Sequence, residues 1–147
     1  MILHTKFEEE IEIRESDIIH FEQGLPGFEE EKQFVLVPIE DTLFSILQSV
    51  STKELAFFTV NPFLFFKEYD FELTESVQEQ LNINNESDVM VQVILTINDP
   101  FEKSTANLQA PVVINHKENL AKQVVLTDSR YQTRHALTES TFVSQEG

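Results

Sequence analysis

The chain has 147 residues and carries 26 Asp and Glu against 10 Lys and Arg, which gives a net charge of −16. It has no Cys and only three Gly, which excludes disulfides, thiolate metal sites, cysteine nucleophiles and glycine-rich phosphate loops. Hydrophobic residues make up 41% of the chain, so we expect one folded domain with a buried core.

The excess negative charge is confined to the first hundred residues. Residues 1–50 hold 12 acids and 3 bases and residues 51–100 hold 9 and 2, whereas residues 101–147 hold 5 of each. Such a surface repels RNA and anionic lipid and attracts basic proteins, although solubility alone also explains it. No apolar segment approaches the roughly 20 residues of a membrane span, so we predict a cytoplasmic protein without membrane contact.

Alternating apolar residues in the first third predict short strands. Residues 2–7 and 11–13 are expected to form a hairpin with Glu8–Glu10 at its tip. A strand over residues 18–21 leads into Gly24–Phe28, where Pro26 and Gly27 suit the central positions of a type II turn. Two further strands are expected over residues 34–39 and 44–50.

Residues 57–71 hold six of the 13 phenylalanines. Apolar residues fall on both faces of any strand drawn through residues 55–66. One face must pack in the core, and the other must either be buried under another element or be exposed as an apolar patch. Burial under a second layer and exposure at a protein interface are both open, and the residues alone favour burial, because burying one Phe contributes about 1.5 to 3 kcal/mol.

A helix is predicted over residues 74–81. Thr74 suits its N-cap, apolar residues recur every four positions, and Asn82 suits a left-handed end. The most regular strand follows at residues 89–97, and it is expected to pair as a hairpin with residues 106–114 through a turn at Asp99-Pro100.

The last predicted strand, residues 122–126, closes the sheet. The segment after it is expected to pack through Tyr131 and Leu137. We therefore predict an all-β fold, a small antiparallel β-barrel-like domain with one or two short helices, and a sandwich stays as the alternative. Residues 1–137 form the single domain, and residues 138–147 are a variable C-terminal tail.

Candidate chemical sites are weak. The histidines lie at no ligand spacing, no nucleophile elbow surrounds a triad of Asp128, Ser129 and His135, and the runs Glu8–Glu10 and Glu29–Glu31 lack the alternating ligands of a calcium loop. The residues alone give catalysis little weight, with an enzyme that uses scattered carboxylates as a further rival, and we predict no metal and no cofactor. The four histidines are His4, His20, His116 and His135.

Several motifs in a fixed order resemble one family. They are FEQGLPGFEEEKQFVLVP, LQSVSTKELAFF, NPFLFFKEYDFEL, NDPFEKSTANLQAPVVINHK and AKQVVLTDSRYQTRHAL. Together they resemble the bacterial flagellar assembly factor FliW over nearly the whole chain. Glu9 departs from the pattern, since many relatives carry a glycine in that hairpin turn.

The resemblance implies a non-enzymatic cytoplasmic protein with two protein partners, monomeric when free and without direct nucleic-acid binding. One partner is flagellin before export. The other is CsrA, a dimeric RNA-binding repressor of flagellin translation, which FliW-like proteins hold away from its messenger RNA.

The resemblance also gives candidate contact residues. It shifts the expectation for the aromatic segment from burial toward partial exposure to a partner. The acidic run Glu29, Glu30 and Glu31 is predicted to oppose RNA. The rival hypothesis is a small-ligand barrel whose phenylalanines line an internal cavity. The predicted partner contacts are Asn61, Pro62, Phe65, Tyr69, Arg134 and His135.

Overall fold

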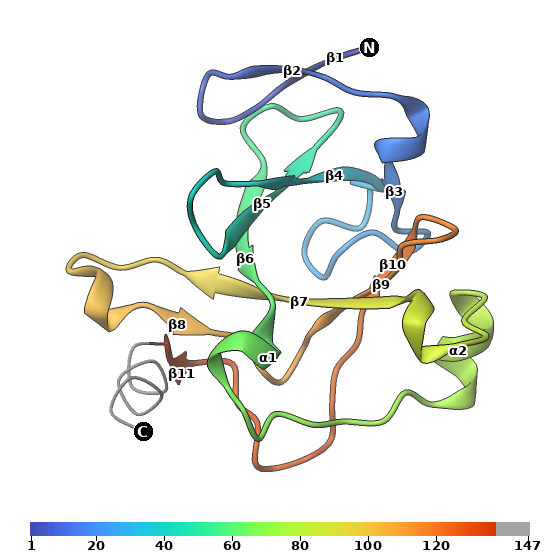
Figure 1. Cartoon of the computed structure of the whole chain (residues 1–147), viewed down its shortest axis with the longest axis vertical. Coiled ribbons are helices and arrows are strands. Elements are labelled where there is room, and N and C mark those ends of the chain that lie inside the picture. Colours follow the sequence, from blue (N-terminus) through green and yellow to red (C-terminus); the bar gives the residue numbers. More distant parts are fainter. Residues whose placement is uncertain (138–147) are drawn as a thin grey trace.

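The computed structural model describes residues 1–137, which form short strands with two short α-helices at their periphery (Figure 1). The helices are α1 (Pro62–Phe65) and α2 (Glu75–Gln80), and 3-10 turns occupy Glu15–Asp17, Glu86–Asp88 and Phe101–Lys103. The strands are β1 (Ile2–His4), β2 (Glu10–Glu12), β3 (Ile19–His20), β4 (Gln33–Pro38), β5 (Phe44–Ser49), β6 (Ala56–Val60), β7 (Val89–Thr96), β8 (Thr105–Ala106), β9 (Val112–Asn115), β10 (Leu120–Gln123) and β11 (His135–Ala136).

Seven strands close into a barrel. The order β7-β6-β5-β4-β3-β10-β9 returns to its start because β9 also pairs with β7. Strands β8 and β11 extend the sheet beside β7, and β1 and β2 form a separate hairpin at the end of the long axis (Figure 1). The barrel prediction is confirmed, and the predicted tail of residues 138–147 lies outside the described residues.

One pair of the ring is not antiparallel. Strands β3 and β10 run parallel, joined at Leu120 and His20. The last strand was predicted over residues 122–126, which begins and ends later in the sequence than the observed β10. Residues Leu120–Gln123 form the ladder, whereas Val124 and Leu126 donate single backbone bonds to Pro111 and Gln109.

The predicted central hairpin forms, but its second strand is broken. Leu95 pairs with Ala106, and Gln92 pairs with Val112. Two residues of β7 therefore face the five residues 107–111, which loop out around a bond from the Ala110 N–H to the Asn107 side chain. Ile97, expected on the buried face, lies beyond the end of β7 and is exposed.

Local predictions at the turns agree with the backbone. Gly27 has φ of 85°, and the Phe28 N–H donates to the Leu25 carbonyl, as a type II turn requires. Thr74 caps α2 by accepting from the Val77 N–H, and Asn82 adopts φ of 55° after the helix. In the first hairpin the left-handed residue is Glu8, not Glu9.

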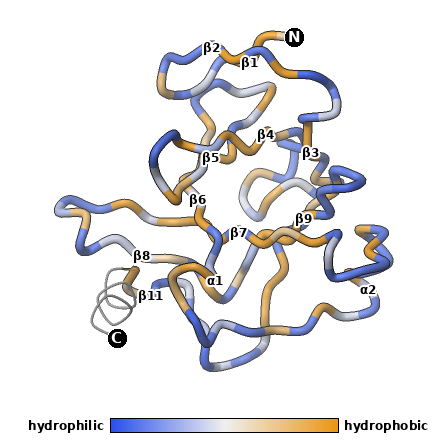
Figure 2. Tube along the Cα trace, in the orientation of Figure 1, coloured by the Kyte–Doolittle hydropathy of each residue, from blue (hydrophilic) through white to orange (hydrophobic). Residues whose placement is uncertain are grey.

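Hydrophobic residues follow the barrel strands, and hydrophilic residues occupy most of the connections (Figure 2). The ring interior is filled by Phe21, Phe34 and Leu47, each almost completely buried, with the two rings edge to face at 5.2 Å. A second cluster between β6, β7 and the last described strand contains Val60, Val93 and Leu137. This second cluster positions the candidate site.

Candidate protein-interaction surface

Helix α1 divides the aromatic segment into an inner and an outer side. The Asn61 side chain accepts from the Phe63 N–H at 2.9 Å, and Pro62 occupies the first turn, where its missing N–H costs nothing. Phe65 turns inward and is 9% exposed, whereas Phe63 and Leu64 turn outward and are 45% and 55% exposed. Phe63 and Leu64 are therefore the exposed apolar surface of this segment, and the sequence alone did not distinguish them from the buried residues.

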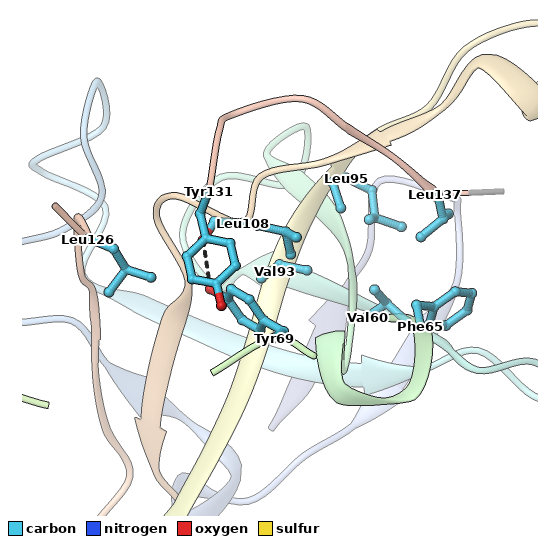
Figure 3. Close-up of a cluster of buried hydrophobic side chains, with 10 residues drawn as sticks. Val60, Phe65, Tyr69, Val93, Leu95, Leu108, Leu126, Tyr131 and Leu137 are labelled. Atoms are coloured by element: carbon cyan, nitrogen blue, oxygen red, sulfur yellow. Dashed lines mark hydrogen bonds between the residues drawn. The ribbon is translucent and has the colours of Figure 1, made fainter. Parts of the chain in front are cut away.

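Tyr69 lies in the core beside Tyr131 (Figure 3). Its hydroxyl donates to the Leu108 carbonyl at 2.7 Å, and the two tyrosine rings meet edge to face with centroids 4.7 Å apart. Burial, with a smaller contribution from Tyr131, raises the pKa of the Tyr69 phenol well above its ordinary value. The phenol therefore stays protonated and serves as a structural donor.

The burial of Phe65 and Tyr69 corrects the expectation that they form an exposed foothold. Their side chains pack with Val60 and Val93 because α1 folds back over the end of β6. Pro62 is buried as well. Whether these residues contribute to partner binding stays a prediction, and the exposed large apolar residues of the segment are Phe63 and Leu64.

The remaining predicted contacts lie at the edge of the same cluster. Arg134 is exposed, and His135 is half-buried with its ring 6.2 Å from the ring of Phe66. The His135 Nε2 accepts from the Gln132 N–H at 2.8 Å, and burial lowers the pKa of the imidazole. The neutral ring is therefore the form that suits this site.

The acidic run has one fixed member and two free ones. Glu31 accepts hydrogen bonds from the hydroxyls of Ser49 at 2.6 Å, Thr52 at 3.0 Å and Ser51 at 3.3 Å. The Ser49 bond is the main cause that lowers the pKa of Glu31. Glu29 and Glu30 are exposed, so two of the three predicted charges face solvent.

A tight turn holds this run in place. Gly24 has φ of 64°, and a Cβ added there would meet the Glu29 carbonyl oxygen at 2.5 Å. The exposed ring of Phe28 lies 5.7 Å from that of Phe57 on β6. The acidic run therefore extends from a loop that is fixed against the sheet.

An open groove of about 930 Å³ lies beside β7. Val89, Met90 and Val91 line one side and residues 70–73 line another, with Phe63 at the α1 end. The groove is open to solvent, and Phe21 and Phe34 fill the barrel interior where the rival hypothesis places a ligand. The packed interior gives no support to an aromatic-lined internal cavity.

The comparisons with known proteins were decisive. The family model described as "FliW protein" matches residues 2–137.

The chain belongs to the FliW family.

Individual FliW proteins match closely over nearly their full length. The "Flagellar assembly factor FliW" of Geobacillus kaustophilus (strain HTA426) is 56% identical over 137 residues, which are 93% of this chain and 95% of that protein. The protein of the same name from Bacillus subtilis (strain 168) is 56% identical over 138 residues, 93% of this chain and 96% of its own. A crystal structure of the flagellar assembly factor FliW superposes with a TM-score of 0.89 at 52% identity, covering 93% of this chain and 96% of that one.

Residues 1–137 of this FliW chain assemble neither of the chemical sites weighed above. Asp128 binds Arg130 instead of His135, and His135 binds the Gln132 backbone, so the two are not joined as in a triad. Within this range no group of three acidic or histidine side chains is placed to hold a metal, and no helix has the length and hydropathy to cross a membrane.

Proposed function

We propose that this protein is a cytoplasmic, non-enzymatic flagellar assembly factor that binds the RNA-binding regulator CsrA and relieves its repression of flagellin messenger RNA. In the same proposal it binds unexported flagellin, which competes for the free factor. The observation that carries the proposal is the match of nearly the full chain to relatives named flagellar assembly factor FliW.

The charge of the chain supports antagonism of an RNA-binding protein. At −16, a bound copy of this chain brings a dense negative field next to a basic RNA-binding surface. RNA binding depends on release of counterions from phosphates, so a neighbouring anionic surface lowers the affinity without filling the RNA site. Glu29 and Glu30, exposed on a loop held by the sheet, are well suited to this role.

The outward side of α1 supports a protein contact. Phe63 and Leu64 are large apolar side chains exposed next to a rigid cluster, and such residues are typical anchors of protein interfaces. Because these side chains stand on a folded helix, binding does not have to order the backbone that carries them.

The direct test measures RNA binding by CsrA with increasing amounts of the purified chain. We expect RNA affinity to fall as the chain is added, and added flagellin monomer to restore it. The Glu29→Gln/Glu30→Gln double variant should antagonise more weakly while keeping its melting temperature. Glu118→Gln/Glu102→Gln is the charge-matched control.

Two results would contradict the proposal. The first is the absence of any complex with both CsrA and flagellin by calorimetry at physiological salt. The second is a complex with CsrA that leaves its RNA affinity unchanged. A pull-down of the tagged chain from its own cells would show independently whether either protein co-purifies.

A further inference from the structure

Strand β7 has one edge that is paired along most of its length and one that is paired only in part. On the first edge, β9 pairs with residues 89–92 and β8 with residues 95–96. On the second edge, β6 pairs only with Ile94 and Val93. Beyond Val60 the chain leaves the sheet and turns into α1, so no strand of residues 1–137 pairs with the first part of β7 on this edge (Figure 1).

Pro62 explains why the pairing stops. Continuing the register from Val60 and Val93 would place Pro62 opposite Val91. Proline has no N–H to donate to a ladder. The Pro62 carbonyl already accepts from the Phe66 N–H at 2.8 Å inside α1, so neither backbone group of this residue is available to β7.

The backbone direction along β7 shows which groups face the open side. The Asp88 carbonyl accepts from the His116 N–H, and the Ile94 carbonyl accepts from the Asn107 N–H, both at 3.0 Å on the β8 and β9 side. Backbone groups alternate in direction along a strand. The backbone groups of Val89 and Val91 therefore point to the opposite side. The Val89 N–H donates there to the Glu86 carbonyl, whereas within residues 1–137 no hydrogen bond reaches the Val89 carbonyl or either backbone group of Val91 on that side.

The open groove lies along this free edge. Val89, Met90 and Val91 form one wall, and the exposed apolar side chain of Phe63 stands at its end. The charged residues that line it are all acidic: Asp70, Glu72 and Glu86, with His116 as the one other titratable group. A free ladder edge, apolar surface and negative charge therefore occur together in one groove.

We propose that the free edge of β7 binds an extended, positively charged segment of a partner protein as an added strand. The segment takes the place that β6 would fill if it continued, antiparallel to β7. It exchanges backbone hydrogen bonds with the N–H and C=O of Val91 and donates one to the Val89 carbonyl. Main-chain bonds supply affinity in such strand addition, and alternate side chains supply specificity. Here the alternate side chains are apolar and basic, and the basic ones meet Asp70, Glu72 and Glu86.

The charge of the groove selects this occupant over others. A second copy of this chain carries the same −16 and would bring like charge to an acidic groove. A cationic segment is attracted instead, and the attraction weakens as salt is added. The inference goes beyond the proposed function, because it concerns how a segment binds and does not depend on the identity of the partners.

The test uses the full chain and a short probe peptide of alternating valine and lysine, acetylated and amidated at its ends. Two further versions carry N-methyl groups, on the valines or on the lysines. Only alternate N–H groups of an added strand face its neighbour. We expect one methylated version to lose about tenfold in affinity by calorimetry and the other to bind within about twofold of the parent.

The position of binding is read from the amide of Val91. In two-dimensional NMR its signal should shift on titration, and its hydrogen exchange should slow. A peptide with glutamate in place of lysine should not bind. Equal binding of both methylated versions, or an unchanged Val91 amide at saturation, would overturn the proposal.

Two variants test the same site from the protein side. Val91→Pro removes the N–H that faces the groove and leaves the bonds to β9, which come from residues 90 and 92. It also replaces a buried valine side chain, so its fold is checked by its melting temperature. If this variant does not fold, Glu72→Lys/Glu86→Lys tests the charge, with Glu12→Lys/Glu15→Lys as the matched control. Loss of peptide binding in the groove variants alone supports the proposal.

A second occupant is tested by sedimentation of the chain without peptide. A concentration-dependent dimer that Val91→Pro abolishes would assign the edge to a second copy and overturn the partner-segment proposal. A monomer at all concentrations, together with peptide binding, supports it.

Discussion

The aromatic segment 57–71 and the acidic run Glu29–Glu31 differ in how many of their side chains are fixed and how many are exposed. Most large apolar side chains of the aromatic segment are buried or partly buried, and only Phe63 and Leu64 among them are exposed. Most of the acidic run turns outward, and only Glu31 is tied down. In both regions a fixed side chain holds the element and the exposed ones are free to act, so anchoring and recognition are carried by different residues of the same segment.

The largest effect should come from removing an inner aromatic residue. Tyr69→Ala or Phe65→Ala should lower the free energy of unfolding by about 3 to 5 kcal/mol, because each leaves a cavity in a packed cluster. Tyr69→Phe should cost less, about 1 to 3 kcal/mol, since it only leaves the Leu108 carbonyl without its donor. Urea denaturation measures both. If Tyr69→Ala left the free energy of unfolding almost unchanged, the assignment of Tyr69 to the buried inner side would be wrong.

The outer side should show the reverse behaviour. Phe63→Ser/Leu64→Ser should lower the free energy of unfolding by only about 1 kcal/mol, because both side chains are exposed and the ring of Phe63 contacts the ring of Tyr69 at 5.7 Å. Affinity for CsrA or flagellin should fall about tenfold if these side chains are anchors. Leu43→Ser, another strongly exposed leucine outside α1, is the control for general loss of apolar surface.

The acidic run offers a smaller contrast. Glu31→Gln should lower stability by less than about 1 kcal/mol, because its hydrogen bonds lie near solvent, and Glu29→Gln should leave it unchanged. The folded-state pKa of Glu31 is lowered, so its contribution is complete above the unfolded pKa and is lost as pH falls through the folded pKa. Denaturation curves of wild type and Glu31→Gln should therefore converge in acid.

The smallest effect expected is a pH dependence from His135. Burial lowers its folded-state pKa, so stability is complete above the ordinary value of about 6.5 and decreases as pH falls through that value toward the folded pKa. His135→Gln keeps an acceptor for the Gln132 N–H and should flatten this part of the profile. A profile identical to wild type would show that the imidazole is not the titrating group.

Patterns that repeat over several residues predicted the fold well. Alternation in residues 89–96 and the cap at Thr74 are local signals, and the structure agrees with both. The parallel pair β3 and β10 escaped prediction because a single bridge between distant residues has no local signal. The break at residues 107–111 was hidden because the apolar alternation continues through it.

The candidate surface was harder to predict than the fold. Phe63, Phe65 and Phe66 look alike in sequence, and only the four-residue helix α1 decides which of them faces inward. Asn61-Pro62 was the available signal, since an N-cap residue followed by proline is typical of a helix start and not of a continuing strand. The division of Glu29–Glu31 depends on hydroxyls from residues 49–52, which no local pattern relates to the run.

Pro62 has a kinetic consequence. Pro62 ends the pairing between β6 and β7, so the free edge of β7 is a permanent feature of the folded chain. No hinge motion is needed to expose it. A segment that binds there finds the site already open. Its association rate constant should therefore be limited by diffusion and should decrease as ionic strength rises, with no slow opening step. Replacing Pro62 by a residue with a backbone N–H would allow β6 to pair further along β7 and would shorten the free edge.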